Sequence, residues 1–156
     1  MLVGQSRLQA GEDAVGDLYE ADVLEWSERQ AALLRQHAAG KLGNETPDWS
    51  NIIEEVESVG REQLHQVESL LAQALAHMLK AEAWPLSGEV PSWLADSRRF
   101  RDDAARRFTP SMRQRINLAK IYRQALRYLP EAIDGTAPLP VPEVCPVTLD
   151  ELLAED

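Results

Sequence analysis

A chain of 156 residues, 44% hydrophobic and 27% charged, has the size and composition of one globular domain that buries its own apolar core. Its single cysteine excludes an internal disulfide and a multi-cysteine zinc site. No run approaches the roughly 20 apolar residues of a membrane span, and the first 17 residues lack the apolar stretch of a signal peptide. We therefore expect a cytoplasmic bacterial protein without membrane contact.

The formal net charge of −10 is distributed unevenly along the chain. Residues 1–91 contain 6 basic and 16 acidic side chains (−10), and residues 92–130 contain 10 basic and 3 acidic ones (+7). Residues 131–156 contain 7 acidic side chains and none that is basic (−7). A basic segment therefore lies between two acidic ones, and this asymmetry is the global feature that says most about partners.

The chain begins with residues 1–16, which carry three glycines and are expected to form a flexible N-terminal arm. A first helix is predicted from about Leu18 to Ala39, with Asp17 as its N-cap because the carboxylate accepts orphan backbone N–H groups. Gly40 supplies a left-handed C-terminal cap. The apolar side of this helix consists of Tyr19, Val23, Trp26, Leu33 and Leu34.

The strongest periodic signal predicts a second helix from about Trp49 to Ala83, with Asp48 or Ser50 near its N-cap. At about 1.5 Å rise per residue this helix is roughly 50 Å long. That is long for a small domain, so we expect part of it to extend past the bundle or to bend near Gly60. The apolar stripe consists of Ile53, Val56, Gly60, Leu64, Val67, Leu71, Ala74, Leu75 and Met78.

Two shorter helices are predicted next. The third begins at Pro91 or Ser92 and ends at about Phe108. The fourth runs from about Pro110 to Leu129, with an extension to Ile133 left open. Proline suits the first helical position, because the N–H that it lacks would have no partner there.

Beyond the fourth helix the chain changes character. Four prolines in residues 134–156 forbid a regular helix over most of this segment, so we expect an extended tail that packs on the helices. Thr148 and Glu151 have the spacing of a capping box, in which each side chain bonds the backbone of the other residue. They predict a short terminal helix.

The predicted fold class is all-α, with four main helices in an up-down bundle over residues 17–133. One helix is overlong, and the extended Pro-rich tail and short terminal helix of residues 134–156 complete the domain. Three of the four tryptophans are expected to pack in the core. Trp84, beside Pro85, is the one expected at the surface.

Several motifs follow one another in the order of a known family. Leu18–Trp26 contains a Tyr-x-x-Asp-x-x-x-Trp pattern, and Asp48–Arg61 is similar to an Asn-Leu-Ile-Glu-Glu-Ile-Glu-Ser-Leu-Gly signature. The further matching segments are His77–Lys80, Ser92-Trp93 with Arg101, and Cys145–Leu149. Over about residues 17–153 the chain thus resembles the bacterial domain-of-unknown-function family 29, which implies an all-helical fold and brings no established activity. Ala81 and Glu82 replace an aromatic residue and a glutamine common in that family, so contacts made there can differ.

Glu57 is the most unusual predicted position. At about 100° per residue it lies about 40° from Ile53, on or beside the apolar stripe, and a buried carboxylate needs a partner or must become neutral. Arg61 is one turn away, Asp22 flanks the apolar face of the first helix, and Arg101 shares the apolar side of the third helix. Two interpretations are open. The charges can form a polar pocket that binds a ligand or carries out acid–base chemistry, or they can form a buried salt-bridge network that fixes helix register.

No metal, cofactor or catalytic nucleophile is predicted. A di-iron bundle requires Glu-x-x-His pairs, and neither His65 nor His77 stands in one. Cys145 has no histidine in its segment and is expected to be a small apolar group packed on the bundle. The chain also lacks a glycine-rich phosphate-binding loop.

The basic segment 92–130 is a second candidate site. Arginine-dense helices can neutralise nucleic-acid phosphates, whereas the net charge of −10 opposes polyanion binding at long range. The alternative is that these cations pair with the acidic second helix and tail. The candidate surface comprises Arg98, Arg99, Arg106, Arg107, Arg113, Arg115, Lys120, Arg123 and Arg127.

We expect a non-enzymatic helical protein–protein interaction or adaptor domain, with a protein partner or a homodimer. The motivation is a long second helix with more apolar surface than three partner helices cover. One alternative is a nucleic-acid-associated protein that uses the basic helices 92–130. Another is an enzyme or ligand-binding pocket built on Asp22, Glu57 and Arg101.

Overall fold

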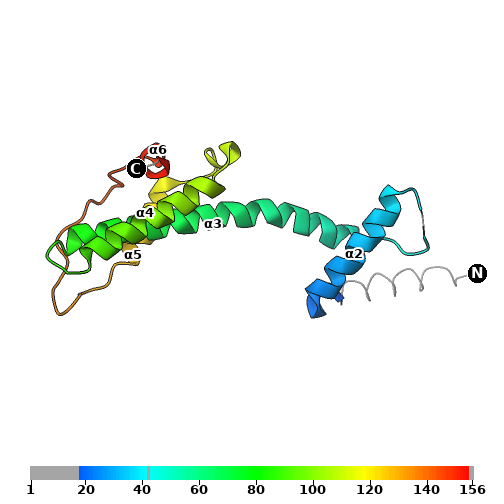
Figure 1. The fold of residues 1–156 in the computed structure, drawn as a ribbon, viewed down its shortest axis with the longest axis horizontal. Coiled ribbons are helices and arrows are strands. Elements are labelled where there is room, and N and C mark those ends of the chain that lie inside the picture. The colour runs from blue at the N-terminus through cyan, green and yellow to red at the C-terminus, as the bar shows by residue number, and fades with distance from the viewer. Residues whose placement is uncertain (1–17, 42, 155–156) are drawn as a thin grey trace, which may run out of the picture. The chain divides into compact units, whose positions relative to one another are not determined.

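The computed structural model describes residues 18–41 and 43–154, and in this part of the chain the all-helical prediction is confirmed (Figure 1). Two compact units are present: an N-terminal unit that ends at Gly60 and a C-terminal unit that begins at Arg61. No β-strand occurs among the described residues, in which Ile133 and Thr136 form an isolated bridge. The predicted arm of residues 1–16 and its neighbour Asp17, the predicted cap, lie outside the described residues.

The N-terminal unit begins with a helical turn at residues 18–21, followed by helix α2 (Val23–Ala38). The predicted helix Leu18–Ala39 is therefore wrong in one respect, because it is interrupted at Asp22. The Asp22 carboxylate accepts the backbone N–H of Glu25 at 3.0 Å and forms the N-cap of α2. An aspartate side chain competes with helical carbonyls for such donors, so the helix restarts here.

Helix α3 (Trp49–Ala83) contains 35 residues and has the predicted bounds. Asp48 precedes it, and its carboxylate accepts the side-chain amide of Asn51 at 2.6 Å. In the N-terminal unit, α2 lies across the first turns of α3 (Figure 1). In the C-terminal unit, the predicted apolar stripe is buried along Val67, Leu71, Ala74 and Leu75.

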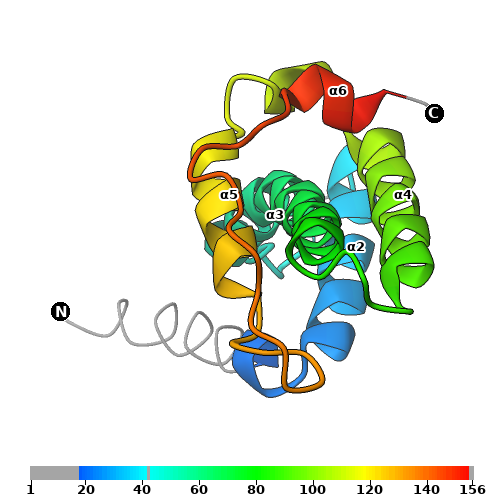
Figure 2. The same cartoon turned by 90° about the vertical axis from the view of Figure 1, so that its left-hand side faces the viewer.

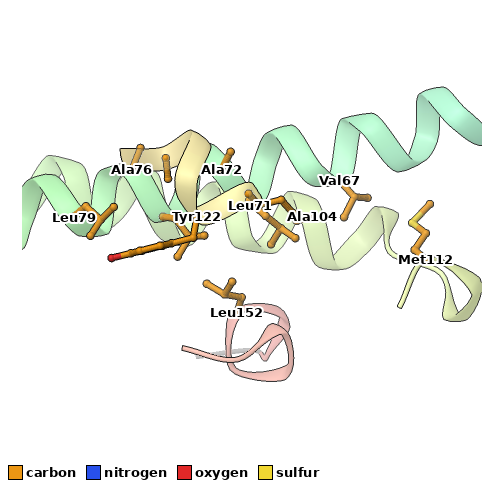
Figure 3. Packing of buried hydrophobic residues seen from close by; sticks show 12 residues of the cluster. Val67, Leu71, Ala72, Ala76, Leu79, Ala104, Met112, Tyr122 and Leu152 are labelled. Carbon is orange, nitrogen blue, oxygen red and sulfur yellow. The ribbon is translucent and has the colours of Figure 1, made fainter. Parts of the chain in front are cut away.

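The C-terminal unit surrounds the second part of α3 with α4 (Val90–Arg107), α5 (Leu118–Arg127) and α6 (Leu149–Leu153). Figure 2 shows α4 and α5 on opposite sides of α3, and α6 packs against α4. Side chains from all of these helices meet in one core, where Leu152 of α6 points toward Tyr122 of α5 (Figure 3). The short α6 therefore completes the core.

The predicted fourth helix, Pro110–Leu129, is wrong in its first turns. Pro110–Met112 forms a 3₁₀ turn, and α5 begins only after Asn117. The Asn117 side chain accepts a backbone N–H of the first turn at 3.0 Å, so an asparagine in mid-segment starts a new helix. The open extension to Ile133 does not occur, because this residue belongs to the turn closed by its bridge.

The proline-rich segment is extended and is bonded to the helices along its length. The N–H of Leu139 donates to the carbonyl of Ala83 at 2.9 Å, at the end of α3. Farther along, the Tyr122 hydroxyl donates to the carbonyl of Pro142 at 2.5 Å. An extended segment outside a helix or sheet cannot pair its backbone N–H and C=O groups with itself, so these bonds to the helices hold it in place. The predicted capping box of α6 is also present.

Trp84 is buried, so the prediction that it lies at the surface is wrong. Its indole Nε1–H donates to the carbonyl of Thr136 at 2.8 Å. The tail thus covers this side chain and satisfies its one polar group, a contact between residues 52 positions apart that local sequence does not reveal.

Candidate functional site

An apolar strip of α3 remains exposed in the N-terminal unit. Trp49, Ile53, Val56 and Val59 are 43–69% exposed, and we call these four residues the N-terminal apolar face. Two of them, Ile53 and Val56, belong to the periodic stripe whose residues Val67, Leu71, Ala74 and Leu75 are buried in the C-terminal unit. Large apolar side chains gathered on one helix face of a small protein mark an interaction surface more often than scattered ones do.

Asp48 organises the N-terminal unit around α2. Its Oδ2 accepts the Nε1–H of the buried Trp26 at 3.1 Å, and its backbone N–H donates to Oε1 of the buried Gln30 at 2.8 Å. Gln30 Nε2 is buried, and no described residue accepts a hydrogen bond from it. The sequence predicts Asp48 near the helix N-cap but not this cluster, because the contacts with Trp26 and Gln30 join residues 22 and 18 positions apart.

A second polar contact joins the two motif segments on which the family resemblance rests. The Tyr19 hydroxyl donates to Oε1 of Glu55 at 2.5 Å, and the Tyr19 ring meets the Trp26 ring edge-on at 4.8 Å. The hydrogen bond to Glu55, assisted by desolvation, raises the pKa of Tyr19. Together with Asp48, this contact fixes α2 against one side of α3 and leaves Ile53 and Val56 exposed beside it.

The predicted burial of Asp22, Glu57 and Arg61 is wrong, because all three are exposed. Asp22 serves as the N-cap of α2, as described above. Glu57 lies beside Val56 on a part of the stripe that is exposed among the described residues of the N-terminal unit, so its position on the stripe does not bury it. The premise of a buried charge network therefore fails at three of its four residues.

Arg101 is half-buried, and it fixes the C-terminal end of α6. Its Nε donates to the carbonyl of Leu152 at 3.0 Å, and its Nη2 donates to the carbonyls of Glu151 at 3.0 Å and Ala154 at 3.3 Å. These carbonyls have no partner within the helix, and a cation at this end also matches the helix dipole. Arg101 therefore has a structural role in the C-terminal unit.

All nine residues of the predicted basic surface are exposed, but four of those on and near α4 are engaged within the unit. Arg99 pairs with Asp96 at 3.2 Å, and Arg106 forms an ion pair with Asp103. Two more engaged arginines are Arg107, which bonds Gln66, and Arg113, which pairs with Asp150. The expected pairing with the acidic tail occurs at Arg113, whereas Arg99 and Arg106 pair with carboxylates of α4 itself and not with the second helix.

The cations of α5 are different. Lys120, Arg123 and Arg127 are exposed, and in the described ranges 18–41 and 43–154 no ion pair or hydrogen bond engages their side chains. Their spacing of three and four residues puts them within about 60° on one face of the helix. We call these three residues the α5 cationic face.

The described part of the chain offers little to a small ligand or a metal. A hollow beside the loop after α2, lined among others by Leu33, His37 and Pro47, has a volume of about 20 Å³, enough for roughly one water molecule. No group of three or more His, Cys, Asp or Glu side chains in this part is arranged to hold a metal ion. None of its helices is long and apolar enough to cross a membrane.

Comparison with known proteins agrees with this geometry. The family described as "Domain of unknown function DUF29" matches residues 18–156. The chain is also similar to a crystal structure, at 1.45 Å resolution, of an alpha-helical protein of unknown function from Rhodospirillum rubrum. The identity is 28%, the TM-score is 0.64, and the match covers 88% of this chain and 90% of the other. No curated protein matches the chain in sequence.

Proposed function

Because the chain belongs to the DUF29 family, whose description assigns no activity, we propose from its surface that it is a non-enzymatic protein–protein interaction domain that pairs with a second copy of itself. The observation that carries the proposal is the exposed N-terminal apolar face of α3. The nucleic-acid alternative depends on the basic helices and is tested with them below. Because Asp22 and Glu57 are exposed, the pocket alternative has less support than the interaction role.

Energetics favour a partner that covers this face. Burying a large aliphatic side chain contributes roughly 1.5–3 kcal/mol, and the side chains here are about half exposed, so each gains about 1 kcal/mol from cover. Four such residues on each copy give on the order of 8 kcal/mol for a symmetric pair. That is enough to offset a substantial part of the free-energy cost of association.

A second copy suits the surface because a two-fold interface must match itself. Gly60 has no side chain, and apart from its own helix backbone and chain neighbours no described atom lies within 4 Å of the position that a Cβ would occupy, so two α3 helices can approach closely there.

Sedimentation equilibrium of the full chain at micromolar concentration tests the proposal. We expect twice the chain mass of 17.5 kDa. Val56→Glu puts a charge in the centre of the face and should give monomer. Leu86→Glu is the matched control, because Leu86 is exposed in the C-terminal unit outside this face, and it should leave the dimer intact. A wild-type protein that sediments as monomer throughout would contradict self-association.

A further inference from the structure

The basic segment divides into an internally compensated part and an uncompensated part. Around α4, the guanidinium groups of Arg99 and Arg106 face carboxylates of their own helix at a spacing of three residues. On α5, Lys120, Arg123 and Arg127 have no carboxylate partner among the described residues. Arg98 and Arg115 also have no carboxylate partner among the described residues, but they stand apart in the sequence, so the largest group of uncompensated cations lies on α5.

The α5 cationic face is a short, straight row. From Lys120 to Arg127 the helix rises roughly 10 Å, so the row spans about two turns. Gln124 and Tyr128 follow the same helical course beside it, and the Gln124 Nε2 donates to the Tyr128 hydroxyl at 2.5 Å. Tyr128 is 47% exposed and adds an aromatic surface at the end of the row.

We propose that the α5 cationic face is a docking surface for an acidic segment of a partner protein. The partner presents carboxylates at a spacing of three to four residues over about two helical turns, with an apolar side chain that contacts Tyr128. This proposal adds a second surface to the self-association proposed above and does not depend on it. A domain with one face for its own copy and another for a client has the organisation of an adaptor.

Charge distribution favours an acidic protein segment over a nucleic acid. The chain carries a net charge of −10, and the segment after α5 is acidic, beginning with Glu131 and Asp134. Double-stranded DNA carries a charge about every 1.7 Å and extends far beyond a row of roughly 10 Å, so it would meet these carboxylates. An acidic peptide can end where the row ends, which confines it to the complementary part of the surface.

Fluorescence anisotropy with full-length protein tests the proposal. The probe is a labelled, alanine-based helical peptide with glutamates at the matching spacing, and a glutamine version is its neutral control. At roughly 50 mM salt we expect binding of the acidic peptide that weakens as salt rises, because surface ion pairs are screened. The neutral peptide should bind at least tenfold more weakly.

Charge reversal locates the surface. The triple change Lys120→Glu, Arg123→Glu and Arg127→Glu should weaken peptide binding by about tenfold or more. The matched triple Arg98→Glu, Arg99→Glu and Arg106→Glu alters the net charge equally and should change binding less than twofold, with folding of both variants checked by circular dichroism. The Val56→Glu variant should still bind the peptide, which separates this surface from the dimer interface.

Three results would overturn the proposal. Absence of acidic-peptide binding at low salt would identify the α5 cationic face as a merely solvated face. Equal loss of binding in both triple variants would indicate a general charge effect. Tighter, α5-dependent binding of a 20-nucleotide single-stranded DNA than of the peptide would assign the surface to nucleic acid.

Discussion

Replacing Arg101 with methionine removes three hydrogen bonds from the end of α6 and keeps an unbranched apolar stem. Hydrogen bonds to a charged group contribute about 1.5–3 kcal/mol each when they are shielded from water. Two of the three are exposed, and water can replace them, so we expect a total loss of about 2–3 kcal/mol. A helix of five residues has no stability of its own, so the loss should appear as undocking of α6 and its buried Leu152.

Hydrogen exchange of the α6 amides measures this effect, since 2–3 kcal/mol corresponds to roughly 30- to 140-fold faster exchange by local opening. Urea unfolding of the same protein gives the global change in free energy. Arg98→Met is the control, because Arg98 is exposed on the same helix and should stay within about 0.5 kcal/mol of wild type. The reasoning fails if α6 exchange is unchanged in Arg101→Met, or if both variants lose the same protection.

Two further predictions concern the N-terminal unit. Asp48→Ala leaves the indole N–H of the buried Trp26 without its acceptor and removes a helix cap. The free energy of unfolding of the N-terminal unit should therefore fall by about 2–3 kcal/mol. Hydrogen exchange of the α2 amides measures this loss, and Trp26 fluorescence is a second readout. The hydrogen bond to Glu55 raises the pKa of Tyr19, so its contribution to stability is present below the usual tyrosine pKa near 10 and is lost as pH rises through the raised value. In a spectroscopic pH titration, the difference between wild type and Tyr19→Phe should show one tyrosine that ionises at a higher pH than a free tyrosine. Ionisation of Tyr19 at the pH of a free tyrosine would contradict the hydrogen bond.

The sequence was informative wherever a signal was local and repeated. The bounds of α3 were predicted because its apolar residues recur over 35 positions without a proline. The capping box at Thr148 was predicted for the same reason, since both partners stand three residues apart. Asp22 and Asn117 were missed as helix starts because each lies inside a segment whose periodicity continues across it.

The candidate site was harder to predict because periodicity identifies a face without identifying what covers it. Glu57 lies where the stripe pattern places it, but among residues 18–41 and 43–60 no element covers that stretch of α3, so the carboxylate is exposed. Arg101 was recognised as inward-leaning, yet its partners are backbone carbonyls about 50 residues away, which carry no signature in the sequence. The α5 cationic face is not distinguishable in the sequence, because the pairing of Arg99 and Arg106 within α4 is visible only in the structure.

The place of Leu152 in the core has a consequence for synthesis on the ribosome. Leu152 packs in the same cluster as Leu71, which precedes it by 81 residues. The ribosome therefore synthesises the apolar side of α3 long before the residue that completes the burial of this side. At roughly 5–20 residues per second this interval lasts about 4–16 s. During that time the nascent chain presents an open apolar helix, and a chain interrupted before α6 should be a substrate for chaperones or proteases.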